Sequence, residues 1–265
     1  TDTSTLTLSV TAVNDAPVDG NETNTATEDV TLTVTDGAAG DLLNNATDAD
    51  GNPLTITAFS VAGQAGPFTV GTPYVISGVG TLTINANGSY TFAPAANYNG
   101  AVPVITYTVS DGTATDTSTL TLSVTAVNDA PVAANDSFTV AEDGSVTVNV
   151  LGNDSDVDGN ALTITQVDGT AITDGGPSVS VTNGSVQLVA GQLIFTPAAN
   201  YNGPASFTYT ITDGTVTATA TVSGTVTPVN DAPVAANDGF TVAEGGSITV
   251  NVLGNDSDVD GNALT

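Results

Sequence analysis

The chain has 265 residues and 28 acidic side chains, and it lacks Lys, Arg, His, Cys, Met and Trp, so its formal net charge is −28. Without cationic side chains the chain cannot neutralise phosphates, which excludes nucleic-acid binding and polybasic membrane contacts. It also has no His, Lys or Cys, which most acyl- and phosphoryl-transfer reactions and zinc sites require. The remaining donors are carboxylate and carbonyl oxygens, which are the ligands of calcium.

A repeated hexapeptide, Val-Asn-Asp-Ala-Pro-Val, divides the chain at residues 13–18, 127–132 and 229–234. Residues 1–18 are identical to 115–132, and residues 232–265 match 130–163 with three changes. The repeats predict four segments: 1–16, the last strand of a preceding repeat; 17–130 and 131–232, two whole repeats; and 233–265, the first part of another. We therefore expect the natural protein to continue in both directions.

Within each repeat the pattern is that of β-strands. Apolar and polar residues alternate in 105–109, 119–125 and 207–211, so that Leu120, Leu122 and Val124 share one face. Asn87-Gly88 and Asn183-Gly184 predict two-residue hairpin turns. There is no amphipathic helix pattern, and a hydrophobic content of 40% argues against disorder. The sequence predicts an all-β fold of tandem Ig-like or cadherin-like sandwiches in an extended array.

The acidic residues recur at fixed places in the repeats. Glu28, Glu142 and Glu244 each follow the proline of the hexapeptide by 11 residues. Three further sets recur: the Asp pairs Asp48/Asp50, Asp156/Asp158 and Asp258/Asp260; the Asp-Gly residues Asp111 and Asp213; and the linker pairs Asn14/Asp15, Asn128/Asp129 and Asn230/Asp231. No basic residue can pair with them, so clustered acids need an external cation or must stay apart.

Calcium is the cation that this donor set favours, although not in an EF-hand. Residues 154–159 resemble the start of an EF-hand loop, but its twelfth position is Thr165 instead of a bidentate Glu. For the recurring acids we predict calcium binding, with turn chemistry as the alternative. For Asp19, Asp36, Asp168 and Asp174 we expect local turn hydrogen bonding only.

At these residues the chain resembles the cadherin-like tandem repeats of large bacterial surface adhesins, the VCBS/RTX-adhesin type. The hexapeptide is similar to the Asp-x-Asn-Asp-Asn-Ala-Pro linker of cadherins, and residues 46–52 are similar to their Asp-x-Asp segment. Residues 196–203, followed by Phe-Thr-Tyr-Thr and Asp213-Gly214, resemble the bacterial variety, and residues 93–112 repeat that pattern. The chain departs from cadherins in lacking an Asp-Arg-Glu motif and the linker's first Asp and last Asn.

The resemblance implies calcium between consecutive repeats. One junction would use Glu28, Asn128, Asp129, Asp156, Asp158 and Asp213. The next would use Glu142, Asn230, Asp231, Asp258 and Asp260, and the first copy of the set would be Asn14, Asp15, Asp48, Asp50 and Asp111. The departures imply fewer ions per junction than in cadherins, and binding wholly inside one repeat stays open.

The predicted function is a non-enzymatic, calcium-rigidified spacer or filament segment of a giant extracellular surface protein, secreted or attached to the cell. Its partners would be the neighbouring repeats, with lateral contacts between copies as an option, and neither nucleic acid nor direct membrane insertion is expected. The alternative is a ligand-, glycan- or ice-binding face, because 47 residues are threonine and rows such as Thr115, Thr117, Thr119, Thr121 and Thr215, Thr217, Thr219, Thr221 would point outward. Hydrolysis by paired carboxylates is disfavoured because the acids recur once per repeat.

Overall fold

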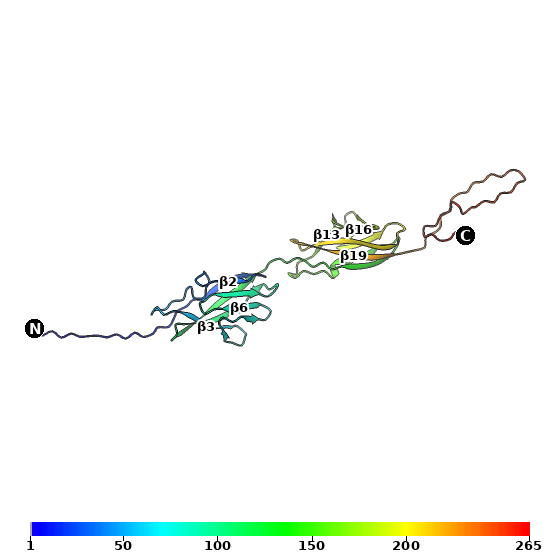
Figure 1. Ribbon diagram of the computed structural model, residues 1–265. Coiled ribbons are helices and arrows are strands. Elements are labelled where there is room, and N and C mark those ends of the chain that lie inside the picture. The colour runs from blue at the N-terminus through cyan, green and yellow to red at the C-terminus, as the bar shows by residue number, and fades with distance from the viewer. Residues whose placement is uncertain (1) are drawn as a thin grey trace. The chain divides into compact units, whose positions relative to one another are not determined.

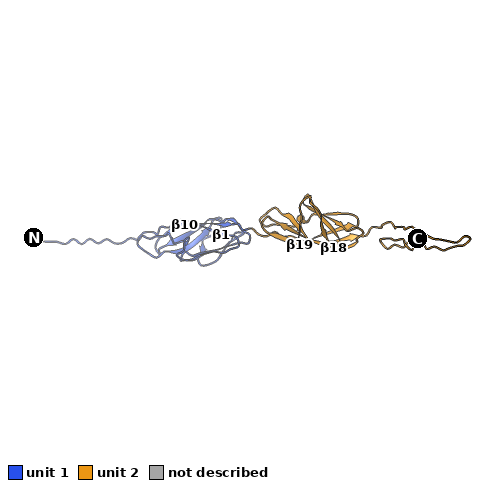
Figure 2. Cartoon of the chain, turned by 90° about the horizontal axis from the view of Figure 1, so that it is seen from above, with its two compact units in different colours: residues 1–127 blue, residues 128–265 orange. Residues whose placement is uncertain are grey.

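The computed structural model describes residues 2–265, and the chain forms two compact units, residues 1–127 and 128–265 (Figure 2). Each unit contains two β-sheets that enclose a hydrophobic core, so the expected all-β sandwich fold is confirmed. Figure 1 shows the strands of each unit and the irregular segments that connect them. The repeat boundaries at residues 17, 131 and 233 remain predictions.

In the first unit, the larger sheet has the order β1-β10-β9-β3-β4, with β8 beside β10. Its strands are β1 (Glu22–Thr27), β3 (Thr55–Val61), β4 (Phe68–Thr69), β8 (Gly100–Ala101), β9 (Ile105–Ser110) and β10 (Thr115–Thr125). β1 runs parallel to β10, with Glu22 opposite Leu120, whereas the other pairs are antiparallel.

The smaller sheet of the first unit covers the other side of the core. Its order is β2 (Leu32–Val34), β7 (Tyr90–Pro94), β6 (Gly80–Ile84) and β5 (Tyr74–Ile76). Leu120, Leu122 and Val124 are buried, as their alternation predicts, and they share the core with Leu82 and Phe92 of the smaller sheet.

The second unit repeats this architecture. One sheet has the order β11 (Asp136–Ala141), β19 (Thr217–Thr227), β18 (Gly203–Thr212), β13 (Thr163–Val167) and β14 (Thr170–Ala171), with β11 parallel to β19. The other has the order β12 (Val146–Val148), β17 (Gln192–Pro197), β16 (Gly184–Val189) and β15 (Val179–Val181). A single 3₁₀ turn, η1 (Val150–Gly152), follows β12, and in residues 2–265 no α-helix forms, as the pattern predicts.

Both predicted hairpin turns are present, but the loop length of the first and the loop residues of the second differ from the prediction. Ser89 and Asn85 are joined by a backbone hydrogen bond of 2.9 Å, so the first loop has three residues, with Gly88 at φ +87°. A three-residue loop ends in a left-handed residue, and glycine supplies that conformation at no steric cost. In the second hairpin Val181 pairs with Gly184, so the loop consists of Thr182 and Asn183, and Gly184 belongs to β16.

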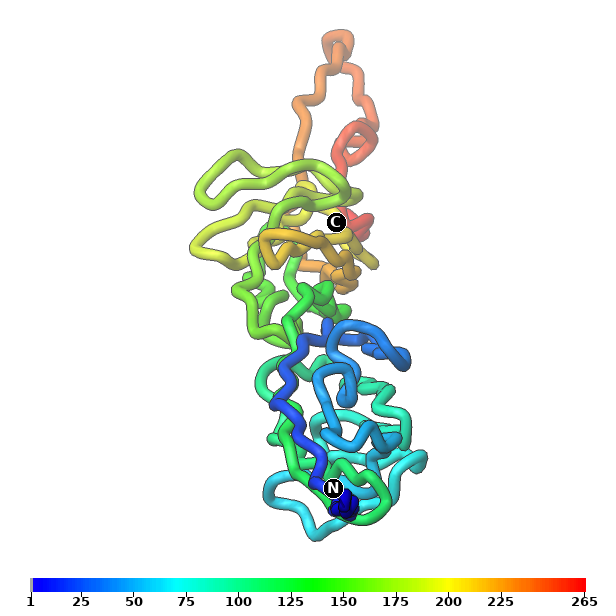
Figure 3. The backbone as a smooth tube through the Cα atoms, turned by 90° about the vertical axis from the view of Figure 1, so that its left-hand side faces the viewer, coloured from blue at the N-terminus to red at the C-terminus, as the bar shows by residue number. Residues whose placement is uncertain are grey.

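Two segments show how much these strands depend on their neighbours. Residues 5–11 have the same sequence as residues 119–125 of β10, yet they form no strand, and Leu6, Leu8 and Val10 are more than 80% exposed. Residues 233–265 form an open loop that folds back on itself (the orange-to-red tube in Figure 3), closed by the bridge between Val234 and Ser257. Strand sequence alone is therefore insufficient; pairing with adjacent strands fixes the structure.

Candidate metal centre

Each copy of the hexapeptide linker is hydrogen-bonded to the Asp-x-Asp loop that follows it. In the second unit, the Asp129 backbone N–H donates to Asp158 Oδ2 at 2.8 Å, and Asn160 Nδ2 donates to Asn128 Oδ1 at 3.0 Å. Asn128 Nδ2 also donates to Asp213 Oδ2 at 2.8 Å. The structure therefore brings together the linker pair, the loop and the Asp-Gly residue. We refer to these residues as the acidic cluster of the second unit.

The loop itself is shaped by its first carboxylate. Asp156 Oδ1 accepts hydrogen bonds from the backbone N–H groups of Asp158, at 2.9 Å, and Asn160, at 3.2 Å. Gly159 lies between them at φ +75°, a conformation that glycine adopts without strain. Because only Oδ1 is used in this turn, Asp156 Oδ2 stays available for another interaction.

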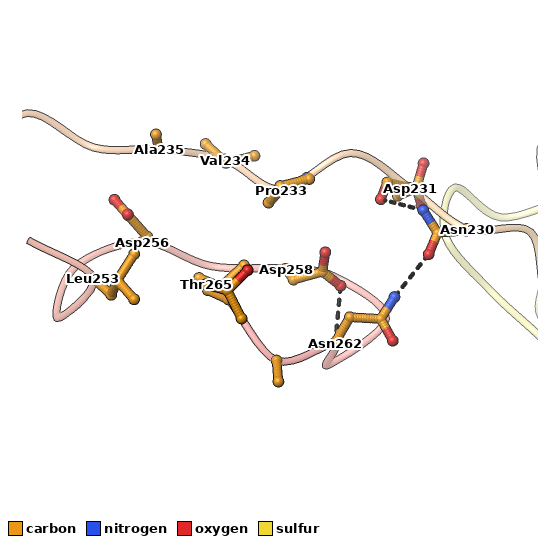
Figure 4. Close-up of a pocket in the computed structure, with 12 residues that line it drawn as sticks. Asn230, Asp231, Pro233, Val234, Ala235, Leu253, Asp256, Asp258, Asn262 and Thr265 are labelled. Atoms are coloured by element: carbon orange, nitrogen blue, oxygen red, sulfur yellow. Dashed lines mark hydrogen bonds between the residues drawn. The ribbon is translucent and has the colours of Figure 1, made fainter.

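The same cluster occurs in the first unit and again in the terminal segment. In the first unit, Asp15 N donates to Asp50 Oδ2 at 2.7 Å, Asn14 Nδ2 donates to Asp111 Oδ2 at 2.7 Å, and Asp48 Oδ1 accepts from the backbone of Asp50 at 2.9 Å. In residues 230–262, Asp231 N donates to Asp260 Oδ2 at 2.6 Å, and Asp258 Oδ1 accepts from the backbones of Asp260 and Asn262 at 3.0 and 3.1 Å. Figure 4 shows the bond from Asn262 to Asp258 and the bond from the Asn262 side chain to Asn230. Three copies thus fold alike.

Two of the recurring glutamates hold the backbone immediately before a linker pair. Glu28, 1% exposed, accepts a hydrogen bond from Val127 N at 2.9 Å, and Glu142, 3% exposed, accepts one from Val229 N at 2.6 Å. Glu244 is exposed. Glu28 and the pair Asn128/Asp129 belong to different units, so their predicted joint coordination of calcium stays a prediction.

Glu142 and the third acidic cluster, which is formed by residues 230–262, lie in the same unit, and the negative charges of both act on Asp231. Loss of solvent raises the pKa of Asp231, and the charges of Asp143, Asp260, Glu142 and Asp258 raise it further. Glu142 and Asp143 come from the end of β11, whereas Asp258 and Asp260 come from the loop after the linker. Acids from both sides of this linker therefore act on one carboxylate without any cationic side chain to offset them.

The donor set fits a calcium ion. Among residues 2–265, Oδ2 atoms of Asp48, Asp156 and Asp231 are shielded from solvent and have no hydrogen-bond partner. A shielded carboxylate oxygen without a donor is unfavourable unless a proton or a cation compensates it. In this part of the chain no three Asp or Glu side chains converge as a finished metal-binding group. The ligand shell would therefore include backbone or amide oxygens and water, which calcium accepts.

Asp111 and Asp213 have the opposite electrostatic environment. The amide of Asn14 lowers the pKa of Asp111, and the amide of Asn128 lowers the pKa of Asp213 in the same way. Backbone N–H groups of the following turn add to this effect, because hydrogen bonds to the charged form stabilise it. These two carboxylates stay ionised within their clusters.

A groove of about 430 Å³ lies beside the third cluster, between the linker and residues 253–265 (Figure 4). Its apolar lining includes Ala235 and Leu253. The equivalent residues of the preceding copy, Ala133 and Leu151, pack against the core of the second unit. The apolar residues of the groove thus correspond to residues that pack against the core in the preceding copy. We therefore infer no ligand from the groove.

The sequence missed a second group of acids, which lies inside the sandwiches. Glu22 is 7% exposed and accepts a hydrogen bond from the hydroxyl of Tyr107, which also faces Asp19. Burial raises the pKa of Asp19, and its expected turn role stays a prediction. In the second unit Tyr209 donates to Asp154 Oδ1 at 2.9 Å.

The other acids for which we expected only turn bonding fall into two classes. Asp168 Oδ1 accepts from Thr208 N at 2.7 Å and Asp174 Oδ1 accepts from Ala190 N at 2.7 Å. Because these partners lie 40 and 16 residues away along the chain, the predicted local turn bonding is wrong for both, and each carboxylate instead bonds to the backbone of a distant segment. Asp36 is exposed, and its turn role stays a prediction.

Comparisons with known proteins agree with this structure. The family model described as bacterial Ig domain matches residues 128–225 and 230–265, and the model described as bacterial cadherin-like domain matches residues 14–126. A calcium-binding lectin, RapA2 of Rhizobium johnstonii, is 29% identical over 245 residues, which cover 88% of this chain and 97% of that protein.

The solved structures that match the chain share less sequence with it. Drosophila N-cadherin EC1-4 is 15% identical with a TM-score of 0.46, and the match covers 81% of this chain and 50% of that one. An endo-fucoidan hydrolase of glycoside hydrolase family 107 is 21% identical with a TM-score of 0.29, and the match covers 81% of this chain and 29% of the hydrolase. From the matches to the family models, the chain belongs to the bacterial Ig domain family, and its first repeat is a bacterial cadherin-like domain.

Proposed function

We propose that this chain is a non-enzymatic segment of an extracellular bacterial adhesin, in which calcium ions at the junctions between repeats restrict the motion of each repeat against the next. The observation that carries the proposal is the geometry at one linker: Asp231 Oδ2 is shielded without a hydrogen-bond partner, Asp231 N bonds to Asp260 in the loop after the linker, and Glu142 bonds to Val229 N just before it. A divalent cation supplies the positive charge that the chain lacks, and it would link Glu142 to the loop of Asp258 and Asp260.

The same arrangement is proposed for the other junction. Glu28 holds Val127 N, one residue before Asn128, just as Glu142 holds Val229 N, one residue before Asn230. The acidic cluster of the second unit would supply the remaining oxygens. Fixing a linker removes its conformational freedom, and calcium binding contributes the free energy for this ordering.

The proposed setting is outside the cell, where millimolar calcium matches the weak sites of extracellular modules. The similarity to a calcium-binding lectin and the cadherin-like domain support this setting. Across residues 2–265 the structure contains no helix with the length and apolarity required to cross a membrane. The non-enzymatic role is supported by the matched families, which are Ig-like and cadherin-like domains.

The distance between the two units tests the proposal. Because the chain has no cysteine, Thr33→Cys and Thr147→Cys introduce unique spin-label sites on exposed strand residues, one in each unit. We expect a narrow distribution of label distances with calcium and a broad one with chelator. A variant with Glu28→Gln, Asp156→Asn and Asp158→Asn should give the broad distribution in both conditions, and Asp174→Asn should behave like the parent. Equal distributions with calcium and chelator in the parent would contradict calcium stiffening.

Glycan binding is a second candidate, favoured by the similarity to a lectin over most of both chains. The threonine rows are one possible surface: Thr117 and Thr121 of β10 and Thr217 and Thr219 of β19 are exposed, although Thr215 lies in the turn before β19. Adhesion to a glycan and calcium stiffening are compatible functions, because the first needs an exposed face and the second needs the linkers. A glycan array probed with the whole chain tests this candidate.

A further inference from the structure

A surface hollow in the first unit shares no lining residue with the acidic clusters. Its lining comes from β4, the start of β5 and the segments beside them, and its volume is about 270 Å³. The residues are Pro67, Phe68, Thr69, Thr72, Pro73 and Tyr74. This volume is slightly below the range of about 300–1,000 Å³ in which drug-sized ligands bind, so a group the size of one small ring fits it best.

Two aromatic rings form the apolar part of the hollow. The rings of Phe68 and Tyr74 are stacked, with centroids 3.6 Å apart and planes 27° apart. Both pack on the buried ring of Phe59, at centroid distances of 5.5 and 6.4 Å. The Tyr74 hydroxyl donates to Gln64 Oε1 at 3.3 Å, and this bond restrains the Tyr74 ring. A ligand would meet an aromatic surface that is already ordered, so binding would not require ordering these rings.

The hollow also lies in the longest uncharged part of the chain. Residues 51–110 contain no Asp or Glu, whereas the other 205 residues carry all 28 acids. In the second unit the corresponding segment, residues 168–181, contains Asp168 and Asp174 and no aromatic residue. Of these two corresponding segments, only that of the first unit therefore combines aromatic rings and threonine hydroxyls with the absence of charge.

We propose that this hollow binds one neutral sugar ring of a glycan, an inference that rests on the glycan-binding candidate above. A sugar ring presents polarised C–H groups on one face and hydroxyls at its rim. The C–H groups would contact an electron-rich face of Phe68 or Tyr74, and the hydroxyls would bond to Thr69, Thr72 or Gln64. Anionic sugars would be repelled by a chain of net charge −28 that offers no cation.

Calcium independence distinguishes this site from binding through the acidic clusters. No residue of the hollow is a carboxylate, and no acid lies within the sequence segment that forms it. Sugar bound there should therefore stay bound when chelator removes calcium. A sugar held through calcium at a linker would be released by the same treatment.

The experiment uses the whole chain and a panel of neutral oligosaccharides of glucose, galactose and mannose beside oligosaccharides of uronic acids. Binding is measured by calorimetry, with calcium and with chelator. We expect binding of a neutral oligosaccharide in both conditions and a loss of affinity of at least about tenfold in Tyr74→Leu, which keeps apolar volume but removes the ring. The matched control is Val75→Ala, the next residue of β5, which is 67% exposed and outside the hollow. Circular dichroism melting checks that each variant folds.

The outcomes separate this site from the broader glycan candidate. If Thr117→Val with Thr121→Val abolishes binding and Tyr74→Leu does not, glycan binding stands and the hollow is wrong. If the uronic-acid probes bind as tightly as the neutral ones, or chelator releases the sugar, the hollow is likewise wrong. If no probe binds the parent chain, both the hollow and glycan binding by this chain are overturned. If Tyr74→Leu melts early, Thr72→Ala on the rim replaces it and should weaken binding severalfold.

Discussion

At the scale of single residues, Glu22 is a buried acid that interacts with the phenol of Tyr107, the amide of Asn45 and two other acids. Burial is the main cause that raises its pKa to about 7, and the charges of Asp19 and Asp41 add to it, while the hydroxyl of Tyr107 opposes it. The folded first unit therefore binds a proton at Glu22 more tightly than the unfolded chain, whose Glu has a pKa of 4.5. The stabilisation from this proton is complete below pH 4.5 and is lost as the pH rises to 7.

Glu22→Gln should remove this pH dependence. Glutamine stays neutral, so the variant should be more stable than the parent at pH 8, by about 2 kcal/mol after allowance for solvent near the group, and similar to it at pH 4.5. Thermal unfolding of the first unit at pH 4.5, 6 and 8 measures the effect. Asp36→Asn, which removes an exposed charge from the same unit, is the control. A stability difference between Glu22→Gln and the parent that does not change with pH would contradict the assignment.

The sequence could predict which acids recur but not which of them the fold buries. Asp48 and Asp156 stand out because the same letters return in each repeat, and the structure gives both the same turn. Glu22 gives a weaker signal: an acid recurs at its position as Asp136 and Asp238, but the residue type changes, and its hydrogen-bond partner Tyr107 lies 85 residues away. Its environment depends on long-range packing, which no local pattern in one sequence reveals.

At the scale of elements, the parallel pair of β11 and β19 depends on a large residue facing a small one. Phe138 lies opposite Gly224, and a Cβ on Gly224 would come within 2.5 Å of the Phe138 ring. The first unit has Asn24 opposite Leu122 at the same place. The large apolar side chain of this pair therefore lies on the first strand, β11, in the second unit and on the last strand, β10, in the first unit.

Gly224→Ala should consequently destabilise the second unit by about 2 kcal/mol, because the ring cannot shift within a packed core. Phe138→Leu should recover part of this loss in the double variant, although it creates space in the parent. Chemical denaturation of the four proteins in the cycle measures the coupling. Gly239→Ala is the control, since a Cβ there would meet nothing within 4 Å. Additive effects of the two substitutions would contradict the direct clash.

The Asp-x-Asp loop gives an element-scale test of calcium binding. Asp156→Asn keeps Oδ1 for the two backbone N–H groups but replaces the unpartnered Oδ2 with an amide donor, which repels a cation. We expect one class of calcium sites to weaken at least about tenfold in calorimetry, while stability in chelator stays the same or rises. Asp174→Asn, whose carboxylate bonds to Ala190 N, should leave calcium affinity unchanged. Unchanged affinity in Asp156→Asn would remove this loop from the proposed site.

Elements were predictable where one face of a strand is buried. Alternation located β9, β10 and β18, because their inward residues must be apolar to reach the core. Turn details were less predictable: an Asn-Gly pair fits several loop lengths, and the register of the flanking strands selects among them. Residues 5–11 show the limit, since the sequence of β10 forms no strand there.

At the scale of the whole molecule, net charge and the linkers determine how the chain meets proteases. There is no Lys or Arg, so trypsin has no cleavage site with or without calcium. Elastase cleaves after small apolar residues, and the linkers offer exposed ones, such as Val127 and Val229 at 46% and 45%. Glu28 and Glu142 hold the backbone N–H groups of these two valines. A protease must bind its substrate in an extended form, so a linker fixed by calcium should be cleaved slowly.

We therefore expect elastase to cleave at residues 126–132 and 228–234 several times faster in chelator than in calcium, with trypsin inactive in both. Glu142→Gln should restore fast cleavage at 228–234 in calcium and leave the linker at 126–132 protected, because each glutamate serves one linker. Mass spectrometry of the fragments over time gives both rates in one sample, so each linker is the control for the other. Equal cleavage rates in calcium and chelator would show that the charges at the linkers are tolerated without a cation, and that the proposed stiffening does not occur.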